Sequence, residues 1–191
     1  MATRLDRFLE SIDPSKTLDV VAARADEALN SFPMDAGALE GSEFMECVGR
    51  FVCHLDNHLL CLNPPRSYDP QAHWGQGCRL LEAEYGHDAI LNANDLARTG
   101  VDGGLLGILR ALARRRADEY ASNEVAARVS AFWGGLTVEG QLSVADEYLA
   151  KYAHLLPRER TESGGIRTKI GFHKTLEQHP HMIQRLQRVG R

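Results

Sequence analysis

The sequence predicts an all-α protein: a single-domain orthogonal or bundle-like array of about six to eight helices with a basic C-terminal segment. Three observations lead to this fold class. Apolar residues recur every three or four positions along most of the chain, and no run alternates apolar and polar residues as a half-buried strand would. Short stretches that contain proline or glycine separate these runs. At 191 residues, 43% of them hydrophobic, the chain is long enough to bury one core.

The first predicted helix lies between two prolines. Asp13 can cap its N-terminus, and Pro14 suits the first helical position, where an amide donor is not needed. An apolar stripe runs along one face and consists of Leu18, Val21, Ala22, Ala25 and Leu29. We expect the helix to end before Pro33, because proline disfavours helical conformation in the residue before it.

The clearest amphipathic helix follows, beginning at Ser42. This serine can cap the helix, and the apolar stripe includes Val48, Leu55 and Leu59. The helix must end near Asn63, because the two prolines after it remove amide donors and push the preceding residue out of the helical region.

Further helices are expected up to residue 156. Capping aspartates and glycines delimit most of them. The glycines beside tryptophan in "WGQG" and "FWGGL" indicate close helix approach or a kink. The expected segments are 69–86, 88–100, 102–121, 122–135 and 137–156, of which the fourth is either a separate helix or a kinked continuation of the third.

Charge divides the chain into two parts. Residues 157–191 carry eight Lys/Arg and three Asp/Glu, a balance of +5, whereas the preceding 156 residues carry fourteen and twenty-three, a balance of −9. We therefore expect a helical core domain over 1–156 and a basic segment over 157–191. This segment contains enough apolar residues to dock on the body or on a second copy, so we expect a homo-oligomer or a protein partner.

Several classes of protein are not expected. The composition is that of a folded chain, and no run of about eighteen apolar residues predicts a membrane span. The first ten residues lack the apolar run of a secretory signal. The four cysteines are irregularly spaced and form no C-x-x-C pair, which indicates free thiols. Together these features predict a cytoplasmic protein.

The stretch "FVCHLDNHLLCL" contains a candidate metal site. His54 and His58 stand four residues apart, so both imidazoles can face one ion from the same side of a helix. Leu55 occupies the place of the glutamate in H-E-x-x-H zinc enzymes. At least one further ligand must come from another helix. The candidates are His73, Cys78, His87, Asp88 and Asp146.

The same two histidines have an ordinary structural interpretation. At a boundary between two helices, an imidazole packs through its apolar ring and hydrogen-bonds through one nitrogen.

The order of these residues resembles that of the HD-domain phosphohydrolases, which are helical. His54 or His58 precedes the dipeptide His87-Asp88 by about thirty residues, and Asp146 follows well downstream. The resemblance implies a divalent transition metal held by these four residues, which lowers the pKa of a bound water for attack on phosphorus. It covers only scattered positions. Gly86 stands directly before the pair, where the family usually has an apolar helix, and Asp88 can serve as a helix N-cap.

The basic segment supplies candidate contacts to phosphate or nucleic acid. These are Arg158, Arg160, Arg167, Lys169, Lys174, Arg185 and Arg188. Phe172 is the only Phe, Tyr or Trp of the basic segment that could stack on a base. No helix-turn-helix or other nucleic-acid-reading module is recognisable. We favour the interpretation that this segment lies against the acidic body of its own chain or of a neighbour.

A second basic cluster, Arg114 to Arg116, precedes Asp118 and Glu119. The i,i+4 spacing predicts compensated surface ion pairs within one helix, each contributing roughly 0–1 kcal/mol.

No complete catalytic constellation can be assembled from the sequence, which lacks a nucleophile elbow, a Walker A loop and a dinucleotide-binding glycine motif. We therefore expect a non-catalytic binding or assembly module. The alternative is a divalent-metal-dependent hydrolase, such as a phosphohydrolase, centred on His54 and His58. A weaker alternative is a nucleic-acid-contacting accessory protein that uses the basic segment.

Overall fold

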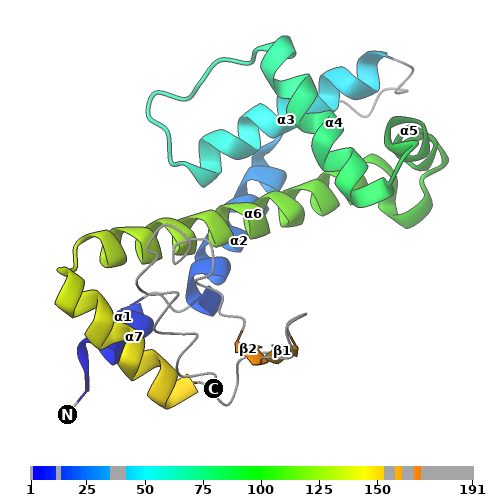
Figure 1. The fold of residues 1–191 in the computed structure, drawn as a ribbon. Coiled ribbons are helices and arrows are strands. Elements are labelled where there is room, and N and C mark those ends of the chain that lie inside the picture. The colour runs from blue at the N-terminus through cyan, green and yellow to red at the C-terminus, as the bar shows by residue number, and fades with distance from the viewer. Residues whose placement is uncertain (1, 12–13, 35–41, 153–157, 161–165, 169–191) are drawn as a thin grey trace. The chain divides into compact units, whose positions relative to one another are not determined.

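A computed structural model describes residues 2–11, 14–34, 42–152, 158–160 and 166–168. These residues form seven α-helices, one 3-10 helix and two short strands (Figure 1). The elements are α1 (Arg4–Ser11), α2 (Pro14–Ser31), α3 (Ser42–Leu59), α4 (Pro70–Tyr85), α5 (Ala89–Thr99), η1 (Val101–Gly103), α6 (Gly104–Gly134), α7 (Val138–Tyr152), β1 (Arg158–Arg160) and β2 (Ile166–Thr168). The predicted all-α class is confirmed.

The helices form two compact units. The central unit comprises Pro14–Val125, and the terminal unit combines Met1–Asp13 with Ala126–Arg191. The boundary between them falls inside α6, so the body that we expected as a single array is built in two parts. The predicted division at residue 156 stays a prediction, because residues 153–157 lie outside those described.

Capping residues delimit α4 as predicted. Asp69 is its N-cap and accepts a hydrogen bond from the Gln71 amide at 3.0 Å, with Pro70 in the first turn. Gly86 closes the helix with a φ of 80°, and its amide donates to the Glu82 carbonyl at 2.9 Å. A positive φ favours glycine at this position.

The start of α6 differs from the expectation. We predicted Asp102 as the N-cap, but it lies in η1 with a φ of 52°, and α6 begins at Gly104. From there α6 continues without a break to Gly134, so the segments 102–121 and 122–135 belong to one helix. No proline or glycine lies between Gly107 and Gly134 to interrupt it.

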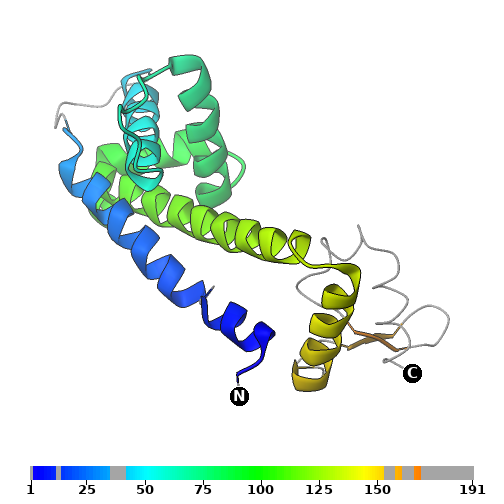
Figure 2. The same ribbon diagram turned by 90° about the vertical axis from the view of Figure 1, so that its left-hand side faces the viewer.

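The core of the central unit is centred on α3. Its apolar face is fully buried and packs with α2, with α4, with the first turn of α5 and with α6 up to residue 121. Figure 2 shows α3 and α4 on the same side of the first part of α6. The largest fully buried side chains of this core are Phe44, Phe51, Leu55, Leu80, Leu81, Leu109, Leu112, Val48 and Val52.

Two glycines allow α3 and α4 to approach closely. A Cβ added to Gly77 would lie 2.8 Å from Val48 Cγ1, and one added to Gly49 would lie 2.7 Å from Trp74 Cδ1. Gly75, by contrast, has open space around it. The close approach expected from "WGQG" is therefore confirmed at Gly77 and not at Gly75.

The terminal unit has a small core of its own. Leu5 of α1 packs with Trp133 at the end of α6 and with Val144 of α7. Helix α1 was not expected from the sequence. Its signal is a capping box, in which the Asp6 amide donates to Thr3 Oγ1 and the Thr3 amide donates to Asp6 Oδ2, both at 3.1 Å.

The two strands were also not expected. β1 and β2 pair antiparallel, with Arg158 opposite Thr168 and Glu159 opposite Arg167. Each strand has only three residues, which is too short for a period-two pattern to be recognisable. Among the described helices, none has both the length and the apolar composition needed to cross a bilayer.

Candidate functional site

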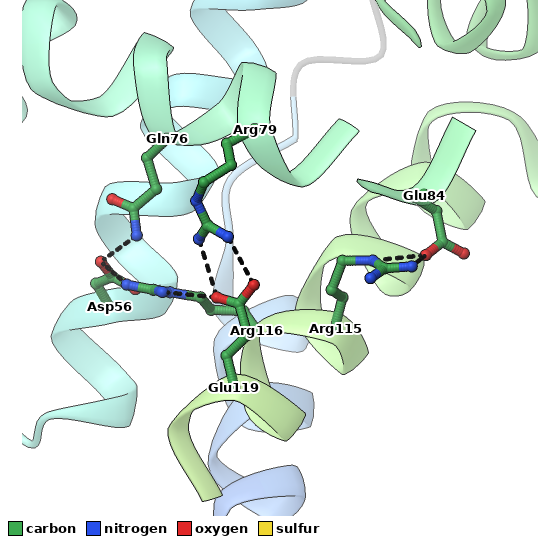
Figure 3. Close-up of polar contacts among 7 residues, drawn as sticks. All are labelled: Asp56, Gln76, Arg79, Glu84, Arg115, Arg116 and Glu119. Atoms are coloured by element: carbon green, nitrogen blue, oxygen red, sulfur yellow. Dashed lines mark hydrogen bonds and ion pairs between the residues drawn. The ribbon is translucent and has the colours of Figure 1, made fainter. Parts of the chain in front are cut away.

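An open groove lies between α4 and α6 of the central unit, and we call it the charged groove. It encloses about 840 Å³. Most of its lining side chains are charged and come from two facing helices (Figure 3). The lining residues are Arg79, Glu84, Ala111, Arg114, Arg115, Arg116, Asp118, Glu119, Ser122 and Asn123.

The sequence of α6 explains this polar face. At about 100° per residue, Ala111, Arg115, Asp118 and Ser122 fall on one stripe of the helix. The apolar residues on the other side of α6 are buried in the core. The helix therefore packs one face inward and presents a charged face to the groove.

Arg116 connects α6 to α3 at the floor of the groove. Its Nε and Nη2 donate to the two carboxylate oxygens of Asp56 at 2.9 and 3.1 Å. Its Nη1 donates to Glu119 Oε2 at 2.9 Å, and its guanidinium lies 4.8 Å from the Tyr120 ring centroid. The side chains of Arg116 and Asp56 are only 15% and 14% exposed, and Gln76 of α4 donates a further bond to Asp56. This is a nearly buried, doubly hydrogen-bonded ion pair.

Two more ion pairs connect α4 to α6. Arg79 donates to both carboxylate oxygens of Glu119, at 2.7 and 2.9 Å. Farther along the groove, Arg115 Nε donates to Glu84 Oε2 at 2.9 Å, and Arg115 Nη2 lies 2.8 Å from the same oxygen. Figure 3 shows these pairs bridging the two helices. The arginines are thus held in fixed positions at the groove surface.

These contacts alter the acidity of the groove. The hydrogen bonds from Arg79 lower the pKa of Glu119 to about 2, with Arg116 contributing in the same direction. At neutral pH the Glu119 carboxylate is therefore fully ionised and acts only as an acceptor.

Two charged side chains of the groove differ from the others. Arg114 and Asp118 are exposed, and neither forms a hydrogen bond or ion pair with another described residue. The spacing had predicted pairs within α6, Arg114 with Asp118 and Arg115 with Glu119. That prediction is wrong, because Arg115 pairs with Glu84 of α4, and Glu119 pairs with Arg79 of α4 and with Arg116 at i,i+3.

The candidate metal ligands His54 and His58 lie close together on α3. Their ring centroids are 4.6 Å apart, and both residues are half-buried. His54 Nε2 lies 3.0 Å from Ser31 Oγ, and its ring centroid lies 5.6 Å from that of Phe32. Burial and the neighbouring His58 lower the pKa of His54. The structural interpretation is confirmed for His54, which packs and hydrogen-bonds at the α2–α3 boundary.

The other two candidate ligands are placed differently. His87 and Asp88 are exposed and directly precede α5, where Asp88 is the N-cap but makes no side-chain capping bond. Within the described residues, no three or more His, Cys, Asp or Glu side chains gather in a way that could hold a metal ion. The structure brings His54 and His58 together without His87 and Asp88, and the metal site stays a prediction.

The candidate phosphate contacts are only partly described. Arg158 and Arg160 belong to β1, and Arg167 belongs to β2. Lys169, Lys174, Arg185 and Arg188 lie outside the described residues. Contact of this segment with nucleic acid stays a prediction.

Four members of the site were not expected from the sequence: Asp56, Gln76, Arg79 and Glu84. One signal was available for Asp56, which lies one helical turn after the fully buried Val52. A carboxylate at the edge of a core requires a partner.

Comparisons with protein-family models, with curated proteins and with solved structures found no match for this chain.

Proposed function

We propose that this protein is a non-catalytic binding or assembly module and that the charged groove is its contact surface for a protein partner. The observation that carries the proposal is the bridging of α4 and α6 by Arg79 and Arg115, whose guanidinium groups are fixed by carboxylates at the groove surface. Side chains that are ordered before binding lose less conformational entropy when a partner arrives.

The electrostatics of the groove favour binding over catalysis. A general acid or base works best when its pKa lies near the operating pH. Glu119, with a pKa of about 2, is far from that range. Arginine remains protonated at any physiological pH, so it cannot exchange protons in a reaction.

The charge pattern favours a protein over a nucleic acid or a small apolar ligand. Small-molecule pockets are mostly lined by apolar and aromatic side chains, whereas seven of the ten residues that line this groove are charged. Three of the seven are acidic and would repel a phosphate backbone: Glu84, Asp118 and Glu119. Arginine is enriched at protein interfaces.

Site-specific crosslinking tests the proposal. A photoreactive phenylalanine analogue in place of Ser122, which lines the groove, is expected to give a crosslinked protein adduct in cells. The matched control carries the same analogue in place of Glu82, an exposed residue of α4 that does not line the groove. Adducts of equal yield at both positions, or no adduct at Ser122, would reject the groove as a contact surface.

A second candidate function is a divalent-metal-dependent hydrolase centred on His54 and His58. The 4.6 Å separation of the two rings on one face of α3 favours it. Elemental analysis of the purified protein and turnover of p-nitrophenyl phosphate with added Zn²⁺, Mn²⁺ or Ni²⁺ decide between the two functions. Stoichiometric metal and turnover, both lost in His54→Ala/His58→Ala with the fold retained, would replace the binding module with the hydrolase.

We place the protein in the cytoplasm on the chemistry of its cysteines. Cys47, Cys53, Cys61 and Cys78 are all free thiols, the state that a reducing compartment maintains. Fractionation of cells that express the tagged protein tests this location, and recovery from a secreted or membrane fraction would contradict it.

A further inference from the structure

The charged groove contains one unmatched cation and one unmatched anion. Its other five charged lining residues all take part in the ion pairs described above. Arg114 and Asp118 do not, and both are exposed. They lie four residues apart on the same helix, which is about 6 Å along its axis. A groove that displays one free charge of each sign suits a partner that displays the same two charges in the opposite direction.

We propose that this partner is a second copy of the chain, with the α6 helices of the two copies antiparallel across the groove. Arg114 of each copy then faces Asp118 of the other. This inference rests on the proposed function and names the partner that it leaves open. In a two-fold symmetric interface the same patch occurs on both sides, so every such contact forms twice.

The rest of the stripe is compatible with this arrangement. The antiparallel register that pairs Arg114 with Asp118 brings Ala111 of one copy close to Ser122 of the other, and both side chains are small enough for the helices to approach. Arg115 lies near the two-fold axis, where two copies of a lone arginine would repel each other. Each Arg115 is already paired with Glu84 of its own chain, at 2.8 Å, which offsets that repulsion.

A purely acidic or purely basic partner fits less well. An acidic peptide would satisfy Arg114 but would place its carboxylates beside Asp118, and a basic one would do the reverse. The same reasoning predicts a weak dimer, because exposed ion pairs contribute little and are screened at physiological salt.

Charge reversal tests the proposal on the full-length chain by sedimentation velocity at low and physiological salt. The wild type is expected to shift from one to two chains as its concentration rises, more readily at low salt. Arg114→Asp and Asp118→Arg, measured singly, are each expected to weaken the dimer at least about tenfold, because each turns two attractive contacts into repulsive ones. The double variant Arg114→Asp/Asp118→Arg is expected to restore dimer formation, because the exchanged charge at position 114 of each copy again faces its opposite at position 118 of the other.

Mixing the two single variants gives a further test of the proposed dimer. Equal amounts of the two single variants are expected to form a mixed dimer, in which one copy presents two aspartates and the other two arginines. The matched control is Asp95→Arg/Arg98→Asp on α5, an exposed pair outside the groove, which should leave the dimer unchanged. Circular dichroism verifies the fold of every variant.

The outcomes separate this inference from the proposed function. A wild type that stays a single chain at every concentration, or single variants that dimerise as the wild type does, would overturn the second copy as partner. If crosslinking at Ser122 then captures a different protein, the binding function stands with another occupant. If it captures nothing, both proposals fall.

Discussion

Two polar residues of α3 that are partly shielded from solvent, His54 and Asp56, lie two positions apart and therefore point to opposite sides of the helix. His54 meets the hydroxyl of Ser31 at the end of α2 and the ring of Phe32 directly after it, and burial lowers the pKa of His54 so that the neutral imidazole is favoured. Asp56 meets the guanidinium of Arg116 and forms a doubly hydrogen-bonded ion pair. The same helix thus places polar groups at the edge of its core in two ways, and the chemistry of the neighbouring helix decides which.

The largest expected effect comes from removing the arginine on the Asp56 side. Arg116→Met leaves the Asp56 carboxylate nearly buried without its cation, so we expect a loss of about 3 kcal/mol in the free energy of unfolding. Urea denaturation followed by circular dichroism measures it.

A double variant tests whether the loss comes from the unpaired charge. Asp56→Leu/Arg116→Met removes both charges, so most of the lost stability should return. A double variant as unstable as Arg116→Met would show that Arg116 acts through packing and not through its charge.

The next effect concerns the close contact of α3 with α4. Gly77→Ala places a methyl group 2.8 Å from Val48 Cγ1, and we expect about 1–3 kcal/mol of destabilisation from overpacking. Gly75→Ala on the same helix is the matched control. It meets nothing within 4 Å and should stabilise by up to about 1 kcal/mol through helix propensity. Equal effects of the two substitutions on the urea midpoint would contradict the close approach.

The two sides of the central unit should lose stability in different pH ranges. The pKa of Glu119 falls from 4.5 to about 2 on folding, so its contribution is present above pH 4.5 and is lost as the pH falls toward 2. The pKa of His54 is lowered from 6.5, so stability is lost as the pH falls below 6.5, because the unfolded chain takes up the proton more readily.

Urea midpoints measured from pH 7 to pH 2 separate these two ranges. Glu119→Gln should remove the acidic part of the pH dependence, and His54→Gln should remove the part just below pH 6.5. If His54→Gln left the slope between pH 6.5 and 5 unchanged, the neutral state of His54 would not be the cause.

The smallest effect is expected at the exposed pair between α4 and α6. Arg115 and Glu84 have side chains 36% and 32% exposed, so Arg115→Met should cost less than about 1 kcal/mol. The contrast with Arg116, its neighbour in sequence, isolates the effect of burial. A loss as large as that of Arg116→Met would show that exposure does not distinguish the two pairs.

The helices were largely predictable because their signals are local. Asp69, Pro70 and Gly86 delimit α4 as expected, and the apolar stripe of α3 is buried as its periodicity indicates. α1 was missed although Thr3 and Asp6 form a capping box that the sequence contains. That motif is short, and no long apolar stripe accompanies it.

The candidate site was much less predictable, because its contacts join different helices. The sequence showed the arginine cluster of α6 and assigned its partners at i,i+4. The actual partner of Arg115, Glu84, lies 31 positions away, and Asp56 lies 60 positions from Arg116. Which carboxylate faces which arginine depends on how α4 crosses α6, and periodicity within one helix carries no information about that crossing.

The two glycines at the α3–α4 contact restrict which sequences can adopt this helix pair. Any side chain at the position of Gly49 or Gly77 collides with Trp74 or Val48, whereas position 75 is free to vary. Homologues that keep the α3–α4 contact should therefore retain both glycines, 28 positions apart, even after most other residues have diverged. That spacing, with a tryptophan three residues before the second glycine, gives a search pattern for distant members of the same lineage.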